Sequence, residues 1–529
     1  MKLNYKRTIL VGFAFFLISA FWQAYDATIA LTLTNKFGMS QGWSGVVMAL
    51  DNILALFMLP LFGTLSDKHK SKSGRRTPFI RFGTTVAAVA LIALSFADVM
   101  QLKQLDAVAA IDDSAALSTL YDSQAGKTLS TPDGDAFILG QDDDAGTIDV
   151  SKEQFVSILS TDTATVVDPD NNKEKEISPY AQYVVPARQA YAADCTAANP
   201  GPLVLFISIL LVLLVAMATF RSPAVALMPD VTVKPLRSKA NAVINLMGTA
   251  GGILVLVLGM IFGTSAVENS LMNYTLYFGV IAAIMVGALV TFLLTVKEPQ
   301  WAAQMQSDAI RYGVEEEQTA EETGEKRKLS GPEMCSLILI LLSVALWYFG
   351  YNAVTSKYSV YAPNVLQKNY NTTMLIAQGA AIIAYLPAGI VASKIGRRKT
   401  ILAGVLMLTT AFGAAAMMTA SSPDLVMNVL FALAGIGWAT INVNSFPMVV
   451  EMSSGADVGK YTGFYYTASM AAQTVTPMLS GFLMDHMGMT VLFPYAAIFA
   501  ALAFVTMFFV RHGDAKPEAK IGLEALDND

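Results

Sequence analysis

The chain has 529 residues, of which 54% are hydrophobic and only 14% are charged. Soluble proteins carry about 25% charged residues, so this composition excludes an ordinary soluble protein and predicts a membrane protein. The net charge of −6 gives no indication of a nucleic-acid partner, because the basic residues are spread over short turns and do not gather on one face.

Apolar runs of about twenty residues recur along the chain, and each is long enough to cross roughly 30 Å of hydrocarbon as a helix. We interpret all of them as helices because an isolated strand leaves its backbone groups unpaired in lipid. The predicted spans are 8–33, 43–65, 78–98, 202–228, 240–263, 274–296, 334–356, 374–393, 399–420, 425–449, 461–483 and 490–510. The sequence therefore predicts an all-α membrane protein of twelve transmembrane helices.

The first apolar run follows three basic residues, Lys2, Lys6 and Arg7, and it contains Asp26. It is longer than the 7–15 residues of a signal-peptide apolar region, so we expect it to remain as a span. Basic residues concentrate on the cytoplasmic side of membrane proteins. We therefore expect a protein of the cell membrane with its N-terminus in the cytoplasm. With an even number of spans, the C-terminus is expected in the cytoplasm as well.

A basic turn punctuated by glycine follows the second span and returns in a shorter form after the eighth. The first copy contains Asp67 and Gly74-Arg75-Arg76, and the second contains Gly396-Arg397-Arg398. One turn used twice indicates two related halves of six helices, an organisation that is typical of transporters.

A second repeated pattern locates an insertion in the first half. Asp230 precedes Lys239 by nine residues, and Glu451 precedes Lys460 by nine. These copies are 221 residues apart, whereas the arginine turns are 322 apart. The first half therefore contains about 101 extra residues, which is the length of the polar stretch 99–200.

The insertion is acidic, with 17 Asp and Glu against 6 Lys and Arg. Its position between the third and fourth spans predicts that it is extracytoplasmic. Turn signals such as Pro132-Asp133-Gly134 alternate with short apolar pieces, which is consistent with a small domain or a loosely ordered loop. The run Asp142–Asp144 lacks the alternating oxygen ligands of a calcium loop, so we interpret it as a solvated turn.

These observations divide the chain into five parts. They are an N-terminal bundle of six helices (1–98 and 201–296), the extracytoplasmic insertion (99–200), a cytoplasmic linker (297–333), a C-terminal bundle of six helices (334–510) and a cytoplasmic tail (511–529).

The pattern Gly63-x-Leu65-x-Asp67…Gly74-Arg75-Arg76, in a chain of two six-helix halves, resembles the signature loop of the major facilitator superfamily. It has four more residues before the second glycine than the usual spacing. The longer form, and the segment from Arg221 to Asp230, are similar to the sucrose–proton symporters and the neighbouring glycoside–pentoside–hexuronide cation symporters. The resemblance covers nearly everything except 99–200 and implies secondary transport by alternating access.

The resemblance also implies a gate at the cytoplasmic helix ends. Asp230 is expected to pair with Arg75 or Arg76, and Glu451 with Arg397 or Arg398, so that the cytoplasmic side is held closed when the cavity faces out. The alternative is ordinary positive charge that sets the topology. The predicted gate residues are Gly63, Asp67, Gly74, Arg75, Arg76, Asp230, Gly389, Arg397, Arg398 and Glu451.

Two acidic residues, Asp26 and Asp51, lie inside predicted spans. Ionisable groups in helix centres cost about 2.5–3.5 kcal/mol each on insertion scales, so they need a functional reason. A rise of ~1.5 Å per residue from the cytoplasmic ends places both at similar depth, in the outer half of the membrane. We interpret both as coupling groups for a proton or a sodium ion; the alternative is that they line an aqueous external vestibule.

Arg221 lies inside the fourth span, where its guanidinium could bind substrate hydroxyls or pair with a carboxylate. Sugars present many hydroxyls and flat C–H faces, so amides and aromatic rings in the spans are further candidates. The predicted substrate-binding residues are Trp22, Gln23, Tyr25, Asn52, Arg221, Asn241, Asn245, Trp347, Tyr348, Tyr351, Asn352, Gln378, Asn442, Asn444, Tyr465 and Gln473.

The sequence therefore predicts a proton- or sodium-coupled symporter of a sugar or glycoside. One alternative is a proton-coupled exporter of drugs or metabolites on the same scaffold, and another is a membrane sensor that uses 99–200 to bind its ligand. No nucleotide-binding loop, metal-ligand set or nucleophile triad appears, so we expect no enzyme, cofactor or metal. The expected partners are a small-molecule substrate, a coupling cation and membrane lipid, with a monomeric chain and no nucleic acid.

Overall fold

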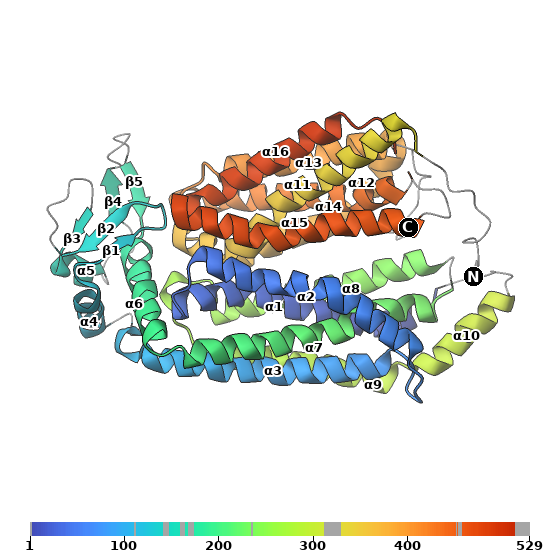
Figure 1. Ribbon diagram of the computed structural model, residues 1–529, viewed down its shortest axis with the longest axis horizontal. Helices are drawn as coiled ribbons and strands as arrows, with labels where there is room; N and C mark the ends of the chain where they lie inside the picture. Colours follow the sequence, from blue (N-terminus) through green and yellow to red (C-terminus); the bar gives the residue numbers. More distant parts are fainter. Residues whose placement is uncertain are drawn as a thin grey trace.

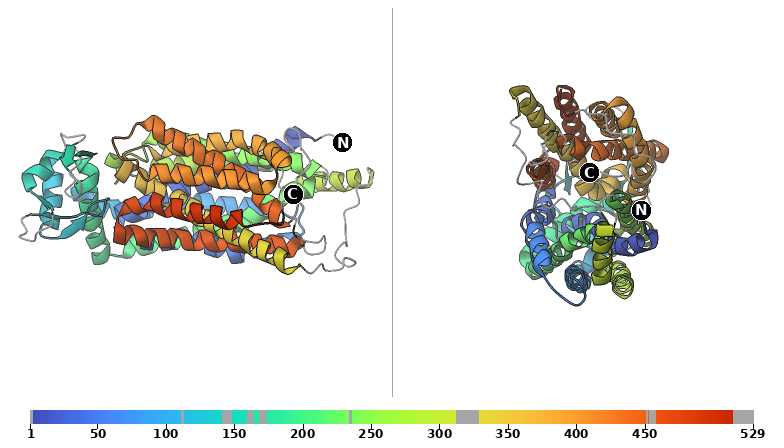
Figure 2. Two further views of the ribbon diagram at one scale, coloured as in Figure 1. Left: turned by 90° about the horizontal axis from the view of Figure 1, so that it is seen from above. Right: turned by 90° about the vertical axis from the view of Figure 1, so that its right-hand side faces the viewer.

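Two bundles of long helices lie side by side, and a smaller module lies at one end of them (Figures 1 and 2). The computed structural model describes residues 3–110, 113–140, 148–158, 164–167, 174–233, 236–311, 329–450, 452 and 458–513. The acidic run Asp142–Asp144 and the predicted gate residue Glu451 lie outside these described residues.

The N-terminal bundle consists of six long helices. They are α1 (Tyr5–Leu31), α2 (Gln41–Lys68), α3 (Thr77–Gln104), α7 (Gly201–Val231), α8 (Arg237–Phe262) and α9 (Thr275–Thr295). Small residues let helix backbones approach closely in membrane proteins. Gly251 of α8 is such a point, because a Cβ there would lie 2.5 Å from the carbonyl oxygen of Phe16 on α1.

The C-terminal bundle also consists of six long helices. They are α11 (Gly331–Tyr361), α12 (Tyr370–Ile395), α13 (Arg397–Ala415), α14 (Asp424–Val450), α15 (Val458–Met487) and α16 (Leu492–Phe508). Gly435 of α14 lies against α12, since a Cβ there would lie 2.1 Å from the carbonyl oxygen of Ala377. Each of the twelve predicted spans thus coincides with one helix of the structure.

Nine of these helices are long and apolar enough to cross a membrane when only the described residues are counted. The remaining three predicted spans are α12, α13 and α15, with 26, 19 and 30 residues. They carry more polar or charged side chains, among them Gln378 on α12, the basic start of α13 and Gln473 on α15. Two of the three therefore contribute polar groups near the centre of the molecule.

The insertion folds around its own apolar core. Its helices and strands are α4 (Ser114–Gln124), β1 (Thr128–Ser130), β2 (Ala136–Leu139), β3 (Ile148–Val150), α5 (Lys152–Ser157), β4 (Ala164–Val167), β5 (Glu174–Ile177) and α6 (Val185–Ala198). β1 and β3 flank β2 in antiparallel and parallel pairing, and β4 pairs with β5. Leu117, Phe137 and Phe155 are fully buried in its core. The predicted all-α class therefore holds for the bundles, and the insertion, for which the sequence left a small domain or a loosely ordered loop open, is a small domain that contains short strands.

The two bundles meet along a contact surface that we call the seam, where α1, α2 and α8 face α11, α15 and α12. The insertion lies at one end of the seam, and helix α10 (Glu298–Arg311) lies at the other (Figure 1). We call these the insertion end and the α10 end of the molecule.

Candidate functional site

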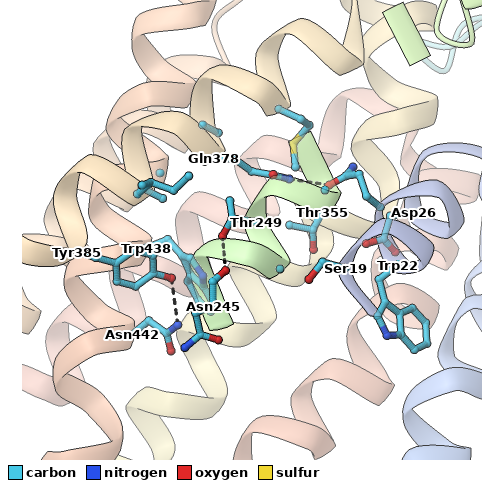
Figure 3. A pocket seen from close by; sticks show the side chains of 18 of the residues that line it. Ser19, Trp22, Asp26, Asn245, Thr249, Thr355, Gln378, Tyr385, Trp438 and Asn442 are labelled. Carbon is cyan, nitrogen blue, oxygen red and sulfur yellow. Dashed lines mark hydrogen bonds between the residues drawn. The ribbon is translucent and has the colours of Figure 1, made fainter. Parts of the chain in front are cut away.

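A cavity of about 580 Å³ lies between the two bundles. Helices α1, α7 and α8 line it from one side, and α11, α12, α13 and α14 line it from the other. Figure 3 shows Trp22 and Asp26 on one side of this space and Tyr385 and Asn442 on the other. A site built from both bundles changes its shape whenever the bundles move against one another.

A smaller hollow of about 190 Å³ adjoins the cavity and contains the second acid, Asp51. Four residues line both spaces: Trp22, Asp26, Arg221 and Thr355. The guanidinium of Arg221 lies 5.5 Å from the centre of the Trp22 ring, within the range of a cation–π contact. The two acids therefore border connected spaces, with an arginine in the wall between them.

Several polar atoms around the smaller hollow have no hydrogen-bond partner among the described residues. These are Nε1 of Trp22, the hydroxyl of Tyr25 and Nδ2 of Asn352. Nδ2 of Asn52 donates to Oδ1 of Asp51 at 2.8 Å. Because buried polar groups are normally paired, three unpartnered donors around two acids indicate a place for water or a ligand.

A chain of amides crosses the seam beside the cavity. Nε2 of Gln378 on α12 donates to Oε1 of Gln23 on α1 at 2.6 Å, and Nε2 of Gln23 donates to the hydroxyl of Tyr370 at 3.3 Å. Figure 3 shows the first of these bonds. Both glutamines line the cavity, so each has a polar group that can also face a solute.

Two aromatic rings form a flat plate on the C-terminal side of the cavity. Tyr351 of α11 and Trp438 of α14 stack with centres 3.7 Å apart and planes 3° from parallel. Tyr348 lies edge-on to Trp438 at 5.2 Å. Beside the plate, Nδ2 of Asn442 donates to the hydroxyl of Tyr385 at 3.5 Å. This side of the cavity thus combines a ring face with hydroxyl and amide groups.

The structure brings most of the predicted substrate residues to these two spaces. Those that line one or both are Trp22, Gln23, Tyr25, Asn52, Arg221, Asn241, Asn245, Tyr351, Asn352, Gln378, Asn442 and Gln473.

Four predicted substrate residues lie away from the cavity lining. Trp347 is fully buried in the core of the C-terminal bundle. Nδ2 of Asn444 donates to the carbonyl oxygen of Thr440 in the same helix. Tyr348 and Tyr465 lie behind the aromatic plate, packed in the same core. The three aromatic residues therefore contribute to the packing of the helices in the C-terminal bundle.

Sequence reasoning missed other lining residues, namely Ser19, Thr249, Thr355, Tyr385 and Trp438. Trp438 had a usable signal, because it precedes the predicted Asn442 by four residues and so shares its helix face.

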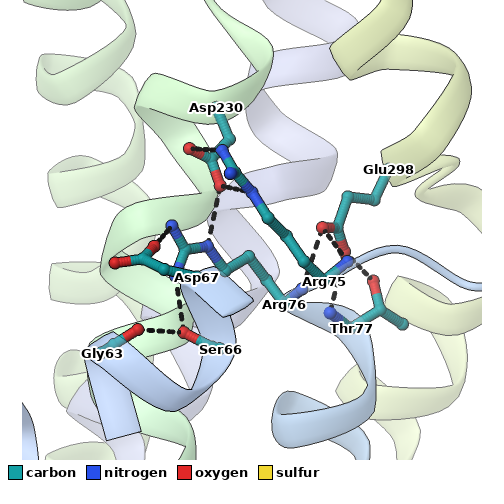
Figure 4. A network of polar contacts seen from close by, with 8 residues as sticks. All are labelled: Gly63, Ser66, Asp67, Arg75, Arg76, Thr77, Asp230 and Glu298. Carbon is teal, nitrogen blue, oxygen red and sulfur yellow. Dashed lines mark hydrogen bonds and ion pairs between the residues drawn. The ribbon is translucent and has the colours of Figure 1, made fainter. Parts of the chain in front are cut away.

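The arginine turn at the α10 end forms a network of ion pairs that we call the latch (Figure 4). Arg75 and Arg76 contact Asp230 at 2.7 and 2.8 Å, and Arg76 also pairs with Asp67. Asp230 therefore pairs with both arginines, where the sequence predicted a pair with one or the other. These residues belong to α2, α7 and the turn that leads into α3, so the latch joins helices of the N-terminal bundle and does not itself cross the seam.

Glu298, which lies in the predicted cytoplasmic linker, completes the latch. Its carboxylate accepts hydrogen bonds from the backbone N–H groups of Arg75, Arg76 and Thr77 and from the Thr77 hydroxyl, at 2.7–2.9 Å. Gly74 has φ +108°, and a Cβ there would lie 2.2 Å from the Glu298 carboxyl carbon. The glycine is thus required by both its backbone conformation and the approach of the acid.

The second copy of the turn is only partly described. Arg398 donates to the carbonyl oxygen of Phe508 on α16 and lies over its ring. Gly389 lies within α12, and Arg397 begins α13. The predicted pairing with Glu451 falls on a residue outside the described part of the chain.

At the insertion end, hydrogen bonds close the seam. Nζ of Lys357 on α11 donates to the carbonyl oxygen of Gln41 at 2.5 Å and to Oγ of Ser44 at 2.8 Å. Asp485 on α15 accepts from the N–H groups of Gln41 and Gly42 at 2.6 and 2.7 Å. The first turn of α2 is therefore held by a lysine and an acid from the opposite bundle.

Comparison with known proteins agrees with this architecture. Residues 370–526 match the family model described as Major Facilitator Superfamily. The MFS-type transporter ppzB of Metarhizium rileyi is 26% identical over 141 residues, which are 26% of this chain and 29% of that protein. The corresponding protein of Metarhizium majus is 26% identical over the same length, 30% of its own chain. The chain thus aligns with less than a third of the length of the curated relatives it matches.

Solved structures match over nearly the whole chain. The xylose transporter XylE from E. coli in an inward open conformation gives a TM-score of 0.57 at 13% identity, covering 99% of both chains. The peptide transporter POT in complex with sulfate gives 0.58 at 11% identity, covering 96% of this chain and 93% of that one. The C-terminal bundle of this multi-pass membrane protein is thus similar in sequence to the Major Facilitator Superfamily, and both bundles are similar in fold to these solved transporters.

Proposed function

We propose that the chain is a secondary transporter that carries a sugar or glycoside together with a proton or a sodium ion. One observation carries the proposal: Asp26 and Arg221 line both the central cavity and the hollow that contains Asp51. A cation bound among these acids and a solute in the cavity would share a wall. Their binding is then coupled, which is the requirement for driving a solute with an ion gradient.

The lining of the cavity supports a sugar as the solute. The stacked pair Tyr351 and Trp438 offers a flat ring face suited to the C–H face of a pyranose. Gln378, Asn245 and Asn442 lie around it with amide groups that both donate and accept hydrogen bonds. This mixture fits a solute with many hydroxyls better than the apolar compounds that a drug exporter carries.

The acids support cation coupling. A carboxylate inside a membrane bundle is costly, so it is retained where it binds an ion or a proton. The unpartnered hydroxyl of Tyr25 and the amide of Asn352 lie around the same hollow, and they supply further polar groups to a bound cation or its water. The sucrose–proton and glycoside–pentoside–hexuronide branches of the superfamily are accordingly our proposed relatives.

We further propose a place in the cell membrane with the α10 end in the cytoplasm and the insertion outside. The basic residues of the latch lie at the α10 end and the acidic insertion lies at the other, as the distribution of basic residues in membrane proteins predicts. The match of residues 370–526 to a transporter family supports the expectation that the chain is not an enzyme.

The test is uptake into proteoliposomes that contain the purified full-length chain. Radiolabelled xylose, glucose, sucrose and maltose are offered separately under an inward proton gradient, an inward sodium gradient or neither. We expect uphill accumulation of at least one sugar under one of the gradients. Export of a hydrophobic dye, with no sugar taken up under either gradient, would favour the exporter instead.

The role of Asp26 is tested in the same vesicles. Asp26→Asn removes the titratable group while keeping its size, so we expect it to abolish uphill accumulation and to leave sugar exchange at equal concentrations largely intact. Asp424→Asn is the matched control, because Asp424 is 82% exposed at the start of α14 and does not line the cavity or the smaller hollow. Undiminished uphill uptake by Asp26→Asn would refute coupling through this acid.

A further inference from the structure

We propose that the insertion is a brace that holds the insertion end of the seam closed and so sets the balance between the two conformations of the carrier. The inference rests on the proposed function, because it concerns the rocking of the bundles that transport requires. It comes from an observation that the transport site does not use: the insertion belongs to one bundle and is seated on the other.

The insertion is fixed to the N-terminal bundle by more than its chain connections. Gly38, which follows the π-helical turn Thr32–Lys36 after α1, has φ +63°, and a Cβ there would lie 2.3 Å from the backbone nitrogen of Ala193 on α6. Nε2 of Gln189 donates to Oδ1 of Asn35 at 2.8 Å. Nε2 of Gln101 on α3 donates to the carbonyl oxygen of Lys36 and to the Thr196 hydroxyl on α6. Helix α6 therefore moves with the N-terminal bundle.

That attachment continues into a buried ion pair. Nζ of Lys36 contacts both carboxylate oxygens of Asp98 at 2.7 and 2.8 Å and the carbonyl oxygen of Met272 at 2.6 Å, and both charged side chains are fully buried. Breaking a buried pair is costly because it leaves an uncompensated charge. The turn that contains Asn35 and Lys36, to which the insertion is hydrogen-bonded, is thus locked to α3 and to the turn before α9.

The far side of the insertion is seated on the C-terminal bundle. The backbone N–H of Met489, in the turn between α15 and α16, donates to the carbonyl oxygen of Pro132 at 2.8 Å. Gly488 in the same turn has φ +83°, and a Cβ there would lie 2.5 Å from the carbonyl oxygen of Asp133 and 3.0 Å from the nitrogen of Gly134. The backbone of this turn therefore lies directly against the backbone of residues 132–134, with no side chain between them.

The seated turn is preformed. Thr131 donates its N–H to the carbonyl of Asp135 at 2.8 Å and accepts one from Gly134 at 3.0 Å. The π-helical turn Tyr180–Val184 of the insertion also contacts the turn Ala362–Leu366 that follows α11. The insertion therefore bridges the seam at two places beside the Lys357 and Asp485 contacts.

Opening the insertion end must break these contacts, because each of them joins the insertion, which moves with the N-terminal bundle, to a turn of the C-terminal bundle. The bridge is a stiff turn held by a backbone hydrogen bond and close glycine packing, so it favours the closed end without locking it. Loss of a single hydrogen bond changes an equilibrium roughly 2- to 10-fold, and we expect changes of this size when the contact is broken.

Two variants break the contact. Gly488→Ala places a Cβ against Asp133, and Met489→Pro removes the N–H that Pro132 accepts. Proline is tolerated at Met489 because this is the first residue of a short helix and the preceding residue has ψ 162°. Gly126→Ala is the matched control, since Gly126 has φ +78° in the insertion but its Cβ would meet nothing within 4 Å.

The readout is the distance between spin labels on the two bundles, measured by electron–electron double resonance in lipid nanodiscs with each sugar and gradient ion of the uptake panel. Labels replace Leu276 at the start of α9 and Leu425 at the start of α14, which are 68% and 74% exposed. Cys195 and Cys335 are replaced by alanine in every sample, because both are free.

We expect the population with the longer distance to rise about 2- to 10-fold in Gly488→Ala and Met489→Pro and to stay unchanged in Gly126→Ala. If a longer distance is populated but both seat variants match the control, the brace is refuted and the proposed transport stands. If no variant, sugar or ion produces a second distance, the rocking motion is refuted and the proposed function fails with it.

Discussion

Glu298 gives the sharpest quantitative prediction for the latch. Its carboxylate is 2% exposed and accepts four hydrogen bonds at the first turn of α3. Glu298→Gln keeps the shape but replaces one oxygen by an NH₂ group, so two of the four bonds are lost. Hydrogen bonds to a charged group contribute about 1.5–3 kcal/mol each, and we expect the free energy of unfolding to fall by about 3 kcal/mol or more.

The assay is thermal unfolding of the purified protein in detergent, followed by intrinsic fluorescence. For a cooperative unit of 150–250 residues, each kcal/mol shifts Tm by about 2–4 °C, so Glu298→Gln should lower Tm by roughly 6–12 °C. Glu333→Gln is the matched control, because Glu333 accepts two bonds from Ser330 at the exposed start of α11. Loss of an exposed helix cap lowers the free energy of unfolding by about 1 kcal/mol.

The comparison isolates burial as the cause. Both substitutions remove one negative charge and hydrogen bonds at a helix N-terminus, and they differ in how far the acid is removed from water. Equal shifts of Tm for Glu298→Gln and Glu333→Gln would refute the argument that the buried acid holds the latch together.

Three further predictions follow from other parts of the structure. Trp438→Ala should raise the half-saturating sugar concentration about 2- to 12-fold, measured by counterflow, because an aromatic stack contributes about 0.5–1.5 kcal/mol; an unchanged value would remove the plate from the site. Lys357→Met loses two hydrogen bonds across the seam, so the longer label distance at the insertion end should become at least about threefold more populated. Partial burial alone would raise the pKa of Asp194, but hydrogen bonds from Lys127 and Gln124 outweigh it and lower the pKa. That contact is intact above the free-carboxyl pKa of about 4 and is lost as the pH falls through the lowered value. Hydrogen-exchange protection of α6 should therefore drop as the pH falls below about 4, and in Asp194→Asn it should not change with pH in this range.

The long helices could be predicted because lipid leaves the backbone no alternative. The place of the insertion followed from the repeat offset, and in the structure α3 ends at Gln104 and α7 begins at Gly201. The shared surroundings of Asp26 and Asp51 were also within reach, since their distances from the helix ends give similar depth. These features depend on length and composition alone.

The rotation of each helix could not be predicted. A helix in a membrane bundle is apolar on all faces, so the sequence does not separate Trp347, which is buried in the core, from Trp438, which lines the cavity. Glu298 was not among the predicted gate residues because it lies in the predicted linker, and only the approach of that linker to α3 buries it. The insertion strands have three or four residues, too few for a clear alternating pattern.

The residues shared by the cavity and the smaller hollow link the binding of a solute in one to the binding of an ion in the other. Trp22, Asp26, Arg221 and Thr355 contact both spaces, so whatever enters one hollow alters the surface offered to the other. Thermodynamic reciprocity then requires that a sugar which tightens ion binding tenfold is itself bound ten times more tightly when the ion is present. Titrating either partner at fixed concentrations of the other would yield the same interaction free energy from both directions.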